Sequence, residues 1–407
     1  MWHDTRRGFN LIRKRANARN NKIKKVELSV IATLIVMVCL LTSYGIYSVV
    51  RTNKAKVNVE NKVEERANVD IYGKEDKNEE KADIKEEDKT DTTSNSNAAV
   101  IKITALGEIM LGKNNIPQSS YALAFKEVAS YTEKSDYTVA SLATNITSVK
   151  DLSNTKTKYI ANEDIANAFS ALNIKALNVA TDHMLDFSKN MFTSTIDTLK
   201  KNKIDVIGLE NDIVYAEKDG IRVAFIGVNN VVIGSAKDYI DAGMYIYDLG
   251  KVKNSIKEAK TKADAVIVMT HYGKENAHEV TDVMRWFARE IIDAGADMVL
   301  GGHSIGIYPV EEYNGKIIIY SLGYLIHDTN NESGKKSAIF NIDIDTEGKV
   351  KQLEIIPTYI DNKVSVKMYK DINEEKSKKL LEELNNGSKF SSYISEIKND
   401  TLIIKAK

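Results

Sequence analysis

The sequence contains a single cysteine, Cys39, among its 407 residues. No intramolecular disulfide can form, so any domain that this chain exposes outside the cytoplasm must be stabilised by its core. Cys39 follows Val36, Met37 and Val38, and this stretch lacks the small residue that a lipoprotein processing site needs. We therefore interpret Cys39 as an ordinary apolar residue of the stretch that contains it.

Several signatures of enzymes and nucleic-acid-binding proteins are also missing. The sequence has no H-E-x-x-H, no Walker phosphate loop and no G-x-S-x-G, which are the motifs of zincins, P-loop enzymes and serine hydrolases. The glycines of residues 107–112 have the wrong spacing for a dinucleotide fingerprint. Residues 99–407 carry a net charge of −4, whereas nucleic-acid binding needs a basic surface. We predict no nucleic-acid partner.

What the sequence does have is a long uncharged stretch, residues 28–50, directly after a basic arm. Residues 1–25 contain nine Lys or Arg and one Asp. Twenty-three residues without a charge can span a bilayer, and no convincing cleavage site follows. We predict a transmembrane signal anchor at 28–50. The basic arm should stay in the cytoplasm, which makes this a single-pass protein of the cell membrane with an extracellular globular domain.

Residues 51–98 have the composition of a disordered tether. They contain ten basic and thirteen acidic residues and almost no large apolar ones, so they cannot bury enough surface to offset their chain entropy. The predicted division is therefore a cytoplasmic arm at 1–27, the membrane segment at 28–50, the tether at 51–98, a main domain at 99–360, and a C-terminal helix and strand at 361–407 that pack on this domain.

Strand-like and helix-like segments alternate along the main domain and are followed by strands alone. Strands are predicted at 100–105, 137–142, 176–180, 206–209, 222–228, 265–269 and 298–300, and helices at 121–131, 163–172, 190–201, 252–261, 280–294 and 374–384. The later strands 317–322, 337–344 and 353–358 have no helices between them and are predicted to be antiparallel. A last short strand is expected at 401–404. This order predicts an α/β sandwich with mixed sheets.

Polar side chains lie on four turns, each at or just beyond the end of a predicted strand. They are Glu108, the pair Asp182 and His183, His271, and His303. The carboxyl ends of parallel strands share one edge of a sheet, so we expect these five residues to converge there. Carboxylates and imidazoles gathered in this way can hold a divalent metal for hydrolysis. A hydrogen-bonded network without a metal is the equally open alternative.

Five short motifs, in order over residues 100–360, resemble the bacterial capsule synthesis protein family typified by the poly-γ-glutamate capsule protein CapA. The family pattern G-D-x-M-L-G-R corresponds to G-E-I-M-L-G-K at 107–113, and N-N-H-x-x-D-x-G to T-D-H-M-L-D-F-S at 181–188. H-W-G-x-E corresponds to H-Y-G-K-E at 271–275. The stretches D-A-G-A-D-M-V-L-G at 293–301 and Y-S-L-G at 320–323 also match. The resemblance implies a fold similar to the calcineurin-like metallophosphoesterases.

The sequence departs from this family pattern at positions that matter for metal binding. Ala143 stands where the family has the Glu of N-L-E, and Ile305 stands where it has the second His of G-H-x-H. Glu108 replaces an Asp, Asp182 an Asn, and Tyr324 the Asn after Y-S-L-G. Two ligands of a two-metal centre would then be missing. Glu108, Asp182, His183, His271 and His303 could still hold one metal, manganese or zinc, or none.

Other polar residues in these motifs have less direct roles. We expect Asp186 and Glu275 to support neighbouring side chains, because such carboxylates more often orient ligands than bind a metal. His278 and His327 match no motif and are predicted to be surface or core residues.

Two functions of different classes follow from the resemblance. In the first, the protein is a non-catalytic, membrane-tethered component that handles an anionic surface polymer and works with membrane-bound synthase components. In the second, it is a metal-dependent hydrolase, a phosphoesterase or polymer amide hydrolase, in which His183 and His271 are catalytic. The missing ligands favour the first. The net negative charge of the domain argues against binding of a polyanion over a broad surface, since like charges repel.

Overall fold

The structure is a computed structural model that describes residues 99–407 except 113–120, 149–158, 278, 328–330 and 363. The predicted arm, membrane segment and tether, residues 1–98, lie outside this range, as does His278. Among the described helices, none has the length and apolarity needed to cross a membrane. The described residues belong to one compact unit.

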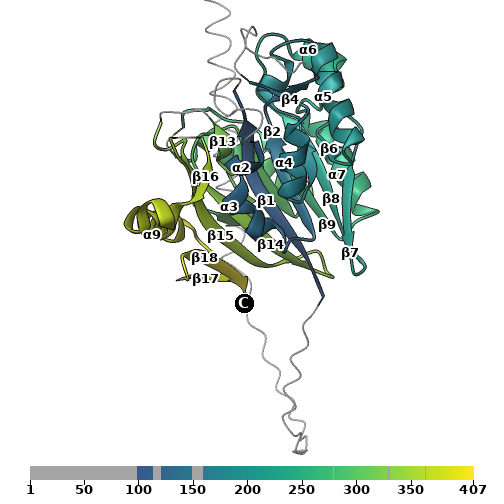
Figure 1. Cartoon of the computed structure of the whole chain (residues 1–407). Coiled ribbons are helices and arrows are strands. Elements are labelled where there is room, and N and C mark those ends of the chain that lie inside the picture. Colours follow the sequence, from purple (N-terminus) through teal and green to yellow (C-terminus); the bar gives the residue numbers. More distant parts are fainter. Residues whose placement is uncertain (1–98, 113–120, 149–158, 278, 328–330, 363) are drawn as a thin grey trace, which may run out of the picture. The chain divides into compact units, whose positions relative to one another are not determined.

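A ten-stranded mixed sheet forms the larger half of the fold (Figure 1). Its order is β17-β18-β15-β14-β1-β2-β5-β6, with β13 beside β1 and β16 beside β15. Two groups of strands meet at β1. The pairs β13–β1, β1–β2, β2–β5 and β5–β6 are parallel, whereas β14 is antiparallel to β1 and the pairs among β14 to β18 are also antiparallel. The strands are β1 (Val100–Met110), β2 (Tyr137–Leu142), β5 (Ile174–Asn178), β6 (Asp205–Ile207), β13 (Tyr324–His327), β14 (Lys336–Asp345), β15 (Val350–Ile360), β16 (Val366–Met368), β17 (Tyr393–Lys398) and β18 (Thr401–Ala406).

A second, six-stranded sheet has the order β11-β12-β10-β9-β8-β7. Its four central strands are parallel, and the two edge strands, β11 and β7, are antiparallel to their neighbours. The strands are β7 (Val214–Lys218), β8 (Ile221–Asn229), β9 (Ala265–His271), β10 (Met298–Gly302), β11 (Glu311–Tyr313) and β12 (Lys316–Ile319). Strands β8, β9 and β10 are buried almost throughout, as expected for parallel strands covered on both faces.

The two sheets pack face to face, and helices cover their outer faces. One hydrophobic cluster takes residues from both sheets, among them Ile103, Phe225 and Leu300. A second joins the outer face of the larger sheet to its helices, and a third does so for the smaller sheet. The helices are α2 (Tyr121–Ala124), α3 (Lys126–Thr132), α4 (Ile165–Ala171) and α5 (Lys189–Lys201) over the larger sheet, and α7 (Leu249–Lys260) and α8 (Asp282–Asp293) over the smaller. The predicted α/β sandwich with mixed sheets is confirmed at this level.

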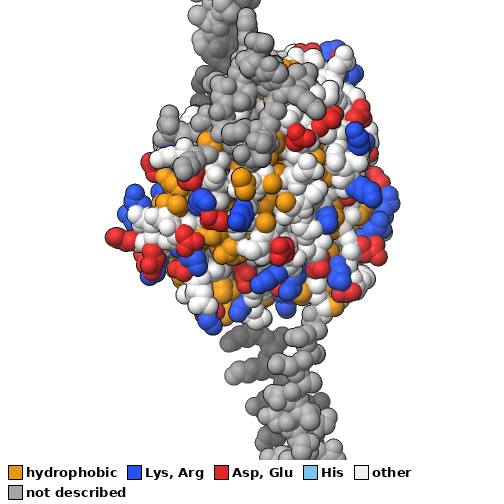
Figure 2. Space-filling view, viewed as in Figure 1, with side chains coloured by type: hydrophobic (Ala, Val, Ile, Leu, Met, Phe, Trp, Pro, Cys, Tyr) orange, Lys and Arg blue, Asp and Glu red, His pale blue; other side chains and the backbone are white. Residues whose placement is uncertain are grey.

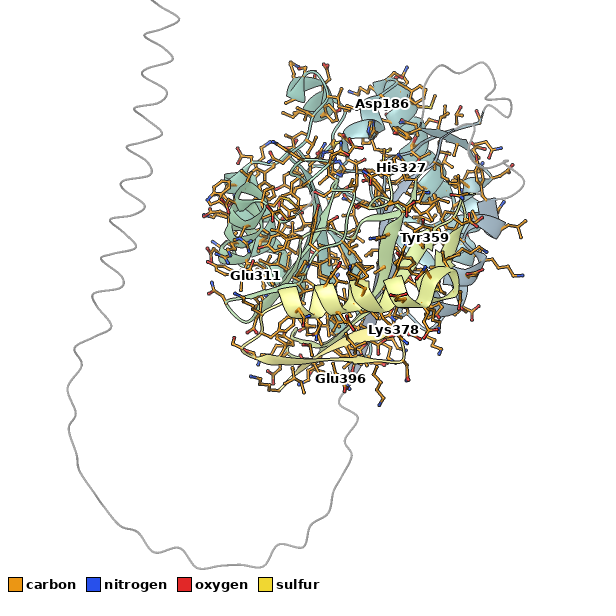
Figure 3. All side chains as sticks on the ribbon, turned by 90° about the vertical axis from the view of Figure 1, so that its left-hand side faces the viewer. Asp186, Glu311, His327, Tyr359, Lys378 and Glu396 are labelled. Carbon is orange, nitrogen blue, oxygen red and sulfur yellow. The ribbon has the colours of Figure 1, made fainter. Side chains whose placement is uncertain are left out.

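The C-terminal segment is part of the same core. Helix α9 (Tyr369–Gly387) lies across the molecule in Figure 3 and places Tyr369, Leu381 and Leu384 in the cluster between the sheets. Strand β18 pairs with β15 and extends the larger sheet. A further short pair, β3 (Asn145–Thr147) and β4 (Ile160–Asn162), and helix α6 (Ala236–Asp241) lie close to the site described below.

Two predictions about secondary structure were wrong. The single helix expected at 121–131 is two helices, because Phe125 has φ −109° and ψ 3°, a turn conformation that lets its ring enter the core. The strand expected at 317–322 is antiparallel to β11, as predicted, but it pairs in parallel with β10, which was not expected. After β10 the chain passes through a loop and the edge strand β11 before it forms β12 beside β10. The parallel strands β10 and β12 are therefore connected without a helix.

Candidate metal centre

The carboxyl ends of strands from both sheets meet at one end of the sandwich and bring the predicted residues together. Glu108 lies near the end of β1, and Asp182 begins the 3-10 turn Asp182–Leu185 that follows β5. His271 is the last residue of β9, and His303 directly follows β10. The prediction of convergence at strand ends holds, but the expected single sheet edge was wrong. The parallel strands of the two sheets have similar sequence patterns. No local feature of the sequence therefore shows to which sheet a strand belongs.

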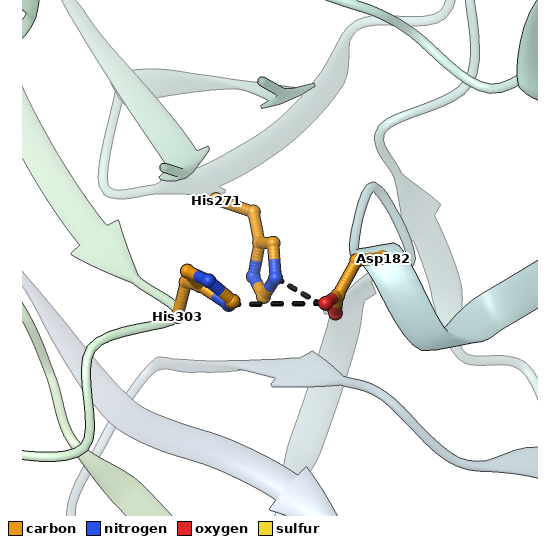
Figure 4. A group of neighbouring side chains, drawn as sticks. All are labelled: Asp182, His271 and His303. Atoms are coloured by element: carbon orange, nitrogen blue, oxygen red, sulfur yellow. Dashed lines mark hydrogen bonds and ion pairs between the residues drawn. The ribbon is translucent and has the colours of Figure 1, made fainter. Parts of the chain in front are cut away.

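Asp182, His271 and His303 form the centre of this cluster (Figure 4). One potential ligand atom from each lies within 4.8 Å of the other two. His271 Nε2 is 3.0 Å from Asp182 Oδ1, and His303 Nδ1 is 3.9 Å from Asp182 Oδ2. On the other side of the His271 ring, Nδ1 is 3.4 Å from Glu108 Oε1. The His271 ring therefore lies between the carboxylates of Asp182 and Glu108.

His183 lies at the rim of the cluster rather than in its centre. Its Nε2 is 3.8 Å from Asp182 Oδ2, and its Nδ1 is 2.8 Å from Asp186 Oδ2. The side chain of His183 is 22% exposed, whereas that of His271 is 1% exposed. The structure thus places His183 where it can meet a ligand from solvent, and Asp186 fixes the orientation of its ring, in the supporting role predicted for that carboxylate.

The pKa values of the two carboxylates are shifted in opposite directions. Burial raises the pKa of Glu108 to about 7, although the charge of His271 acts against this. Burial would also raise the pKa of Asp182, but the hydrogen bond from His271 and the charges of the three histidines outweigh it and hold that pKa below its usual range. Asp182 is the carboxylate that is ionised at neutral pH, as a metal ligand must be.

The pKa values of His271 and His303 are also shifted in opposite directions. Burial would lower the pKa of His271, but Glu108 and Asp182 outweigh burial and raise it above its ordinary value. Burial and the neighbouring charge of His271 lower the pKa of His303 to about 4, so His303 is neutral at pH 7 and free to offer a nitrogen lone pair. His303 also has a φ of +78°. This left-handed conformation is unfavourable for a residue with a Cβ, and such strain is concentrated at functional sites.

The residues present fit one divalent cation. Glu108 Oε1 and His271 Nδ1 are buried and have no hydrogen-bond partner among the described residues, and a buried polar atom without a partner is destabilising unless something binds it. A carboxylate and two imidazoles are a donor set that suits zinc or manganese. Asp182, His271 and His303 would hold the ion, with His183 at the rim and Glu108 on the other side of the His271 ring.

An apolar cluster occupies the positions at which the family pattern has further ligands. Ala143 and Ile305 are buried and pack with Met110, Tyr324 and Ile360. The thioether of Met110 and the hydroxyl of Tyr324 are the only side-chain atoms of this set that could act as ligands, and the Tyr324 hydroxyl donates a hydrogen bond to Glu275 Oε1 at 3.3 Å. The described residues therefore provide for one cation at this end of the fold, with packed side chains where a second set of ligands is expected.

Sequence reasoning missed two residues that hold the 3-10 turn. Asn145 donates from Nδ2 to the carbonyl of His183 at 3.0 Å, and Tyr239 donates from its hydroxyl to the carbonyl of Asp182 at 2.6 Å. Asn145 lies just past the end of β2, so the strand-end rule could have found it. Tyr239 is on α6, far from any strand end, and no sequence signal pointed to it. His327, predicted to be a surface or core residue, is buried.

Comparisons with known proteins agree with the resemblance noted in the sequence. The model of the family described as "Bacterial capsule synthesis protein PGA_cap" matches residues 102–329. The chain is 26% identical over 305 residues to a PGA biosynthesis protein CapA of Bacillus subtilis, covering 72% of this chain and 80% of that one. It is 27% identical over 279 residues to a capsule biosynthesis protein CapA of Bacillus anthracis, covering 64% and 67%.

More distant similarities extend to other bacteria and to solved structures. A probable polyglutamine synthesis accessory protein of Mycobacterium tuberculosis is 26% identical over 222 residues, covering 50% of this chain and 58% of that one. A 5'-nucleotidase precursor from Thermus thermophilus is 12% identical, with a TM-score of 0.39 over 70% of this chain and 59% of that one.

Proposed function

The chain belongs to the family of bacterial capsule synthesis proteins, and from this membership we propose that it takes part in the synthesis or export of an anionic surface polymer of the poly-γ-glutamate type. The matched region covers most of the main domain. The relatives with the longest matches are described as biosynthesis proteins for such a capsule, and a shorter match is described as an accessory protein of polyglutamine synthesis. An accessory role is consistent with membrane-bound synthase components as partners.

The proposed location is the outer side of the cell membrane. Its support is the basic arm followed by the uncharged stretch 28–50 and the charged stretch 51–98, which give a cytoplasmic N-terminus, a single span and a tether. In this arrangement residues 99–407 work at the cell surface, where the polymer emerges.

The site is proposed to bind one divalent cation and to use it to contact the polymer. The observation that carries this is the cluster of Asp182, His271 and His303, with its ligand atoms within 4.8 Å of one another. The domain is slightly acidic, and the face of the domain drawn in Figure 2 has acidic and basic side chains interspersed. A bound cation would supply Lewis acidity and a positive charge for a carboxylate or amide oxygen. Local contact through the ion avoids the repulsion that a broad acidic surface would exert on a polyanion.

The proposed fold relationship is to the metallophosphoesterases. Two mixed sheets packed face to face, helices on both outer faces, and ligands from the carboxyl ends of strands in both sheets support it. We propose that the apolar cluster around Ala143 and Ile305 stands in place of a second set of ligands, so that a two-metal centre is reduced to one ion.

The test combines metal content with polymer at the cell surface. The purified protein should contain or take up one equivalent of zinc or manganese, and Asp182→Asn and His271→Gln should lose it. Cells that carry either variant should display less surface-bound polymer than wild type at equal protein levels. Glu396→Gln is the control, because Glu396 is exposed on β17, at the end of the molecule remote from Asp186 and His327 in Figure 3. Normal polymer in metal-free variants would contradict a role for the cation.

One observation favours a second candidate, a metal-dependent hydrolase. His183 Nδ1 is held by Asp186, which leaves Nε2 directed toward the cluster. Burial would lower the pKa of His183, but Asp186 and Asp182 outweigh it and raise it. An oriented imidazole with a raised pKa can donate a proton to a leaving group. If the site is hydrolytic, His183→Gln should abolish turnover of a phosphodiester or of the polymer's amide links and leave the metal bound. No turnover by the metal-loaded wild type would exclude this candidate.

A further inference from the structure

A buried tyrosine outside the cluster is bonded to the segment that carries Asp182. Tyr239 lies on α6 and is 2% exposed. Its hydroxyl donates to the carbonyl oxygen of Asp182 at 2.6 Å and accepts from the amide of Ile233 at 3.1 Å. Both hydrogen-bonding roles of this one oxygen are therefore used, and its ring packs in the cluster that also contains Met184 and Met244.

The turn that carries Asp182 and His183 depends on such outside support. It is a 3-10 turn of four residues, a short element with poor hydrogen-bond geometry of its own. The residue before it, Thr181, is extended and is fixed by its hydroxyl to the carbonyl of Leu142 at 2.8 Å. Within the turn, Tyr239 holds the carbonyl of Asp182 and Asn145 holds that of His183. Each of the two site residues is thus fixed by a different side chain.

The segment that contains Tyr239 also contacts the strand that carries His271. The amide of Asn230 donates to the carbonyl of His271 at 2.8 Å, and Asn230 directly follows β8. Between Asn230 and Tyr239 the chain exposes Val232 and Ile233 to solvent. One stretch, residues 230–239, therefore binds the carbonyl of Asp182, in the turn after β5 of the larger sheet, and the carbonyl of His271 at the end of β9 of the smaller sheet.

We infer that Tyr239 is a positioning residue of the metal site, which sets the place of the Asp182 carboxylate relative to the His271 imidazole. This inference rests on the proposed function only for its metal-binding consequence. Asp182 and His271 come from different sheets, and their 3.0 Å contact requires that the two sheets keep their relative place at this end. Tyr239 acts on the Asp182 side and Asn230, through the same stretch, on the His271 side.

Tyr239→Phe is the matched change, because it removes one oxygen and leaves the ring in its cluster. Loss of an outer-shell partner typically lowers metal affinity by about 10- to 100-fold, and we expect the lower end of this range, because Tyr239 touches the backbone of a ligand and not its carboxylate. Tyr245→Phe is the control. Tyr245 is also 2% exposed, its hydroxyl contacts Ser255 on α7 at 2.9 Å, and its ring packs in the hydrophobic cluster under α7 and α8.

The experiment has two arms on the full-length protein. In the first, the metal-free protein carries isotope-labelled histidine, and the imidazole resonances are compared at one pH, with His271→Gln and His183→Gln used for assignment. Tyr239→Phe should move the His271 and His183 resonances, and Tyr245→Phe should leave them in place. In the second, cobalt is titrated, and its visible absorption reports both affinity and ligand geometry. Tyr239→Phe should weaken binding about tenfold and change the absorption bands.

The two arms separate failure of this inference from failure of the proposed function. If the wild-type protein binds no cobalt but Tyr239→Phe still moves the two imidazole resonances, the cation proposal is wrong and the positioning role stands. If the metal-free resonances do not move in Tyr239→Phe, the inference is wrong whatever cobalt does. It is also wrong if Tyr245→Phe causes the same shifts, because the effect would then be a general loosening of the fold.

Discussion

Glu108 is the residue whose ionisation opposes folding most directly. It is 2% exposed, and one of its oxygens has no hydrogen-bond partner among the described residues. Its pKa rises from an ordinary 4.5 to about 7. A group whose pKa is raised in the folded state stabilises the fold below its unfolded pKa, and this contribution is lost as the pH rises through the folded pKa. For Glu108 that window is pH 4.5 to 7.

Glu108→Gln should therefore stabilise the metal-free protein, and more so at high pH. A shift of this size corresponds to at most about 3 kcal/mol; we expect a gain of roughly 1–3 kcal/mol at pH 8 relative to pH 5. The measurement is denaturant unfolding of both proteins in chelator at the two pH values. Glu108→Gln also removes one of the charges that act on His271, so the same comparison is made in a His271→Gln background. An advantage that does not grow with pH would show that Glu108 is not ionised in this range. A gain in stability with a loss of metal affinity would identify Glu108 as a residue kept for function.

At the scale of elements, strand ends were predictable from the sequence and their partners were not. The apolar runs that became β1, β5, β9 and β10 are marked by composition, and each has polar residues at or just beyond its predicted end, so five site residues could be named in advance. Their assignment to two sheets depends on long-range pairing, which no local pattern encodes. Strand β13 was missed because it is only four residues long and follows another strand closely. Its parallel pairing with β1 at Glu108 and Tyr324 is what fixes the first carboxylate.

The contact between β1 and β13 explains why residue 107 is glycine. A Cβ at Gly107 would lie 2.5 Å from the carbonyl oxygen of Gly323 and 2.7 Å from the amide of Leu325, closer than real Cβ atoms come to backbone. The amide of the next residue, Glu108, donates to that same carbonyl at 2.9 Å. Gly107→Ala must therefore push the two strands apart at the site.

We expect Gly107→Ala to destabilise the protein by about 2–4 kcal/mol, as overpacking and lost backbone bonds do, and to weaken metal binding as well. Gly306→Ala is the control. Its added Cβ would have its nearest contact at 3.7 Å, on the ring of Tyr308, and it also lies in the loop after His303. Stability is measured by thermal unfolding of both variants, and metal affinity by a cobalt titration. If the two variants behaved alike, the close approach of β13 would not be what places Glu108.

At the scale of the whole molecule, the chain enters the domain far from the site. Figure 3 shows Asp186 and His327 at one end and Glu396 at the other, and β1 starts at the end where the C-terminus also lies (Figure 1). The core between the sheets contains residues from β1 to β18. Its stability is therefore expected to be complete without any contribution from residues before 99.

A chain that begins at Asn97 should consequently unfold cooperatively at the same temperature as one that begins at Arg51. The composition of residues 51–98, ten basic and thirteen acidic, gives them little apolar surface to bury. We expect melting temperatures within about 2 °C, which corresponds to about 1 kcal/mol of unfolding free energy in a domain of this size. Calorimetry of the two chains is the measurement. A large loss on truncation would mean that the tether docks on the domain and contributes to its core.

The last prediction concerns the orientation of the protein in the membrane. The nine basic residues among residues 1–25 favour retention of the arm in the cytoplasm, so residues 51–407 should face outward. The ten Lys and Arg of residues 51–98 are then exposed to trypsin, whereas a packed domain resists cleavage. Trypsin added to intact cells, after removal of any wall, should release a folded fragment that begins within 51–98, and a tag at the N-terminus should remain protected.

The reverse result would place the domain in the cytoplasm. In that case the domain is cut only after the cells are broken, and the tag is removed from intact cells. The proposed contact with a surface polymer would then have no place to occur, even if the metal site proved correct.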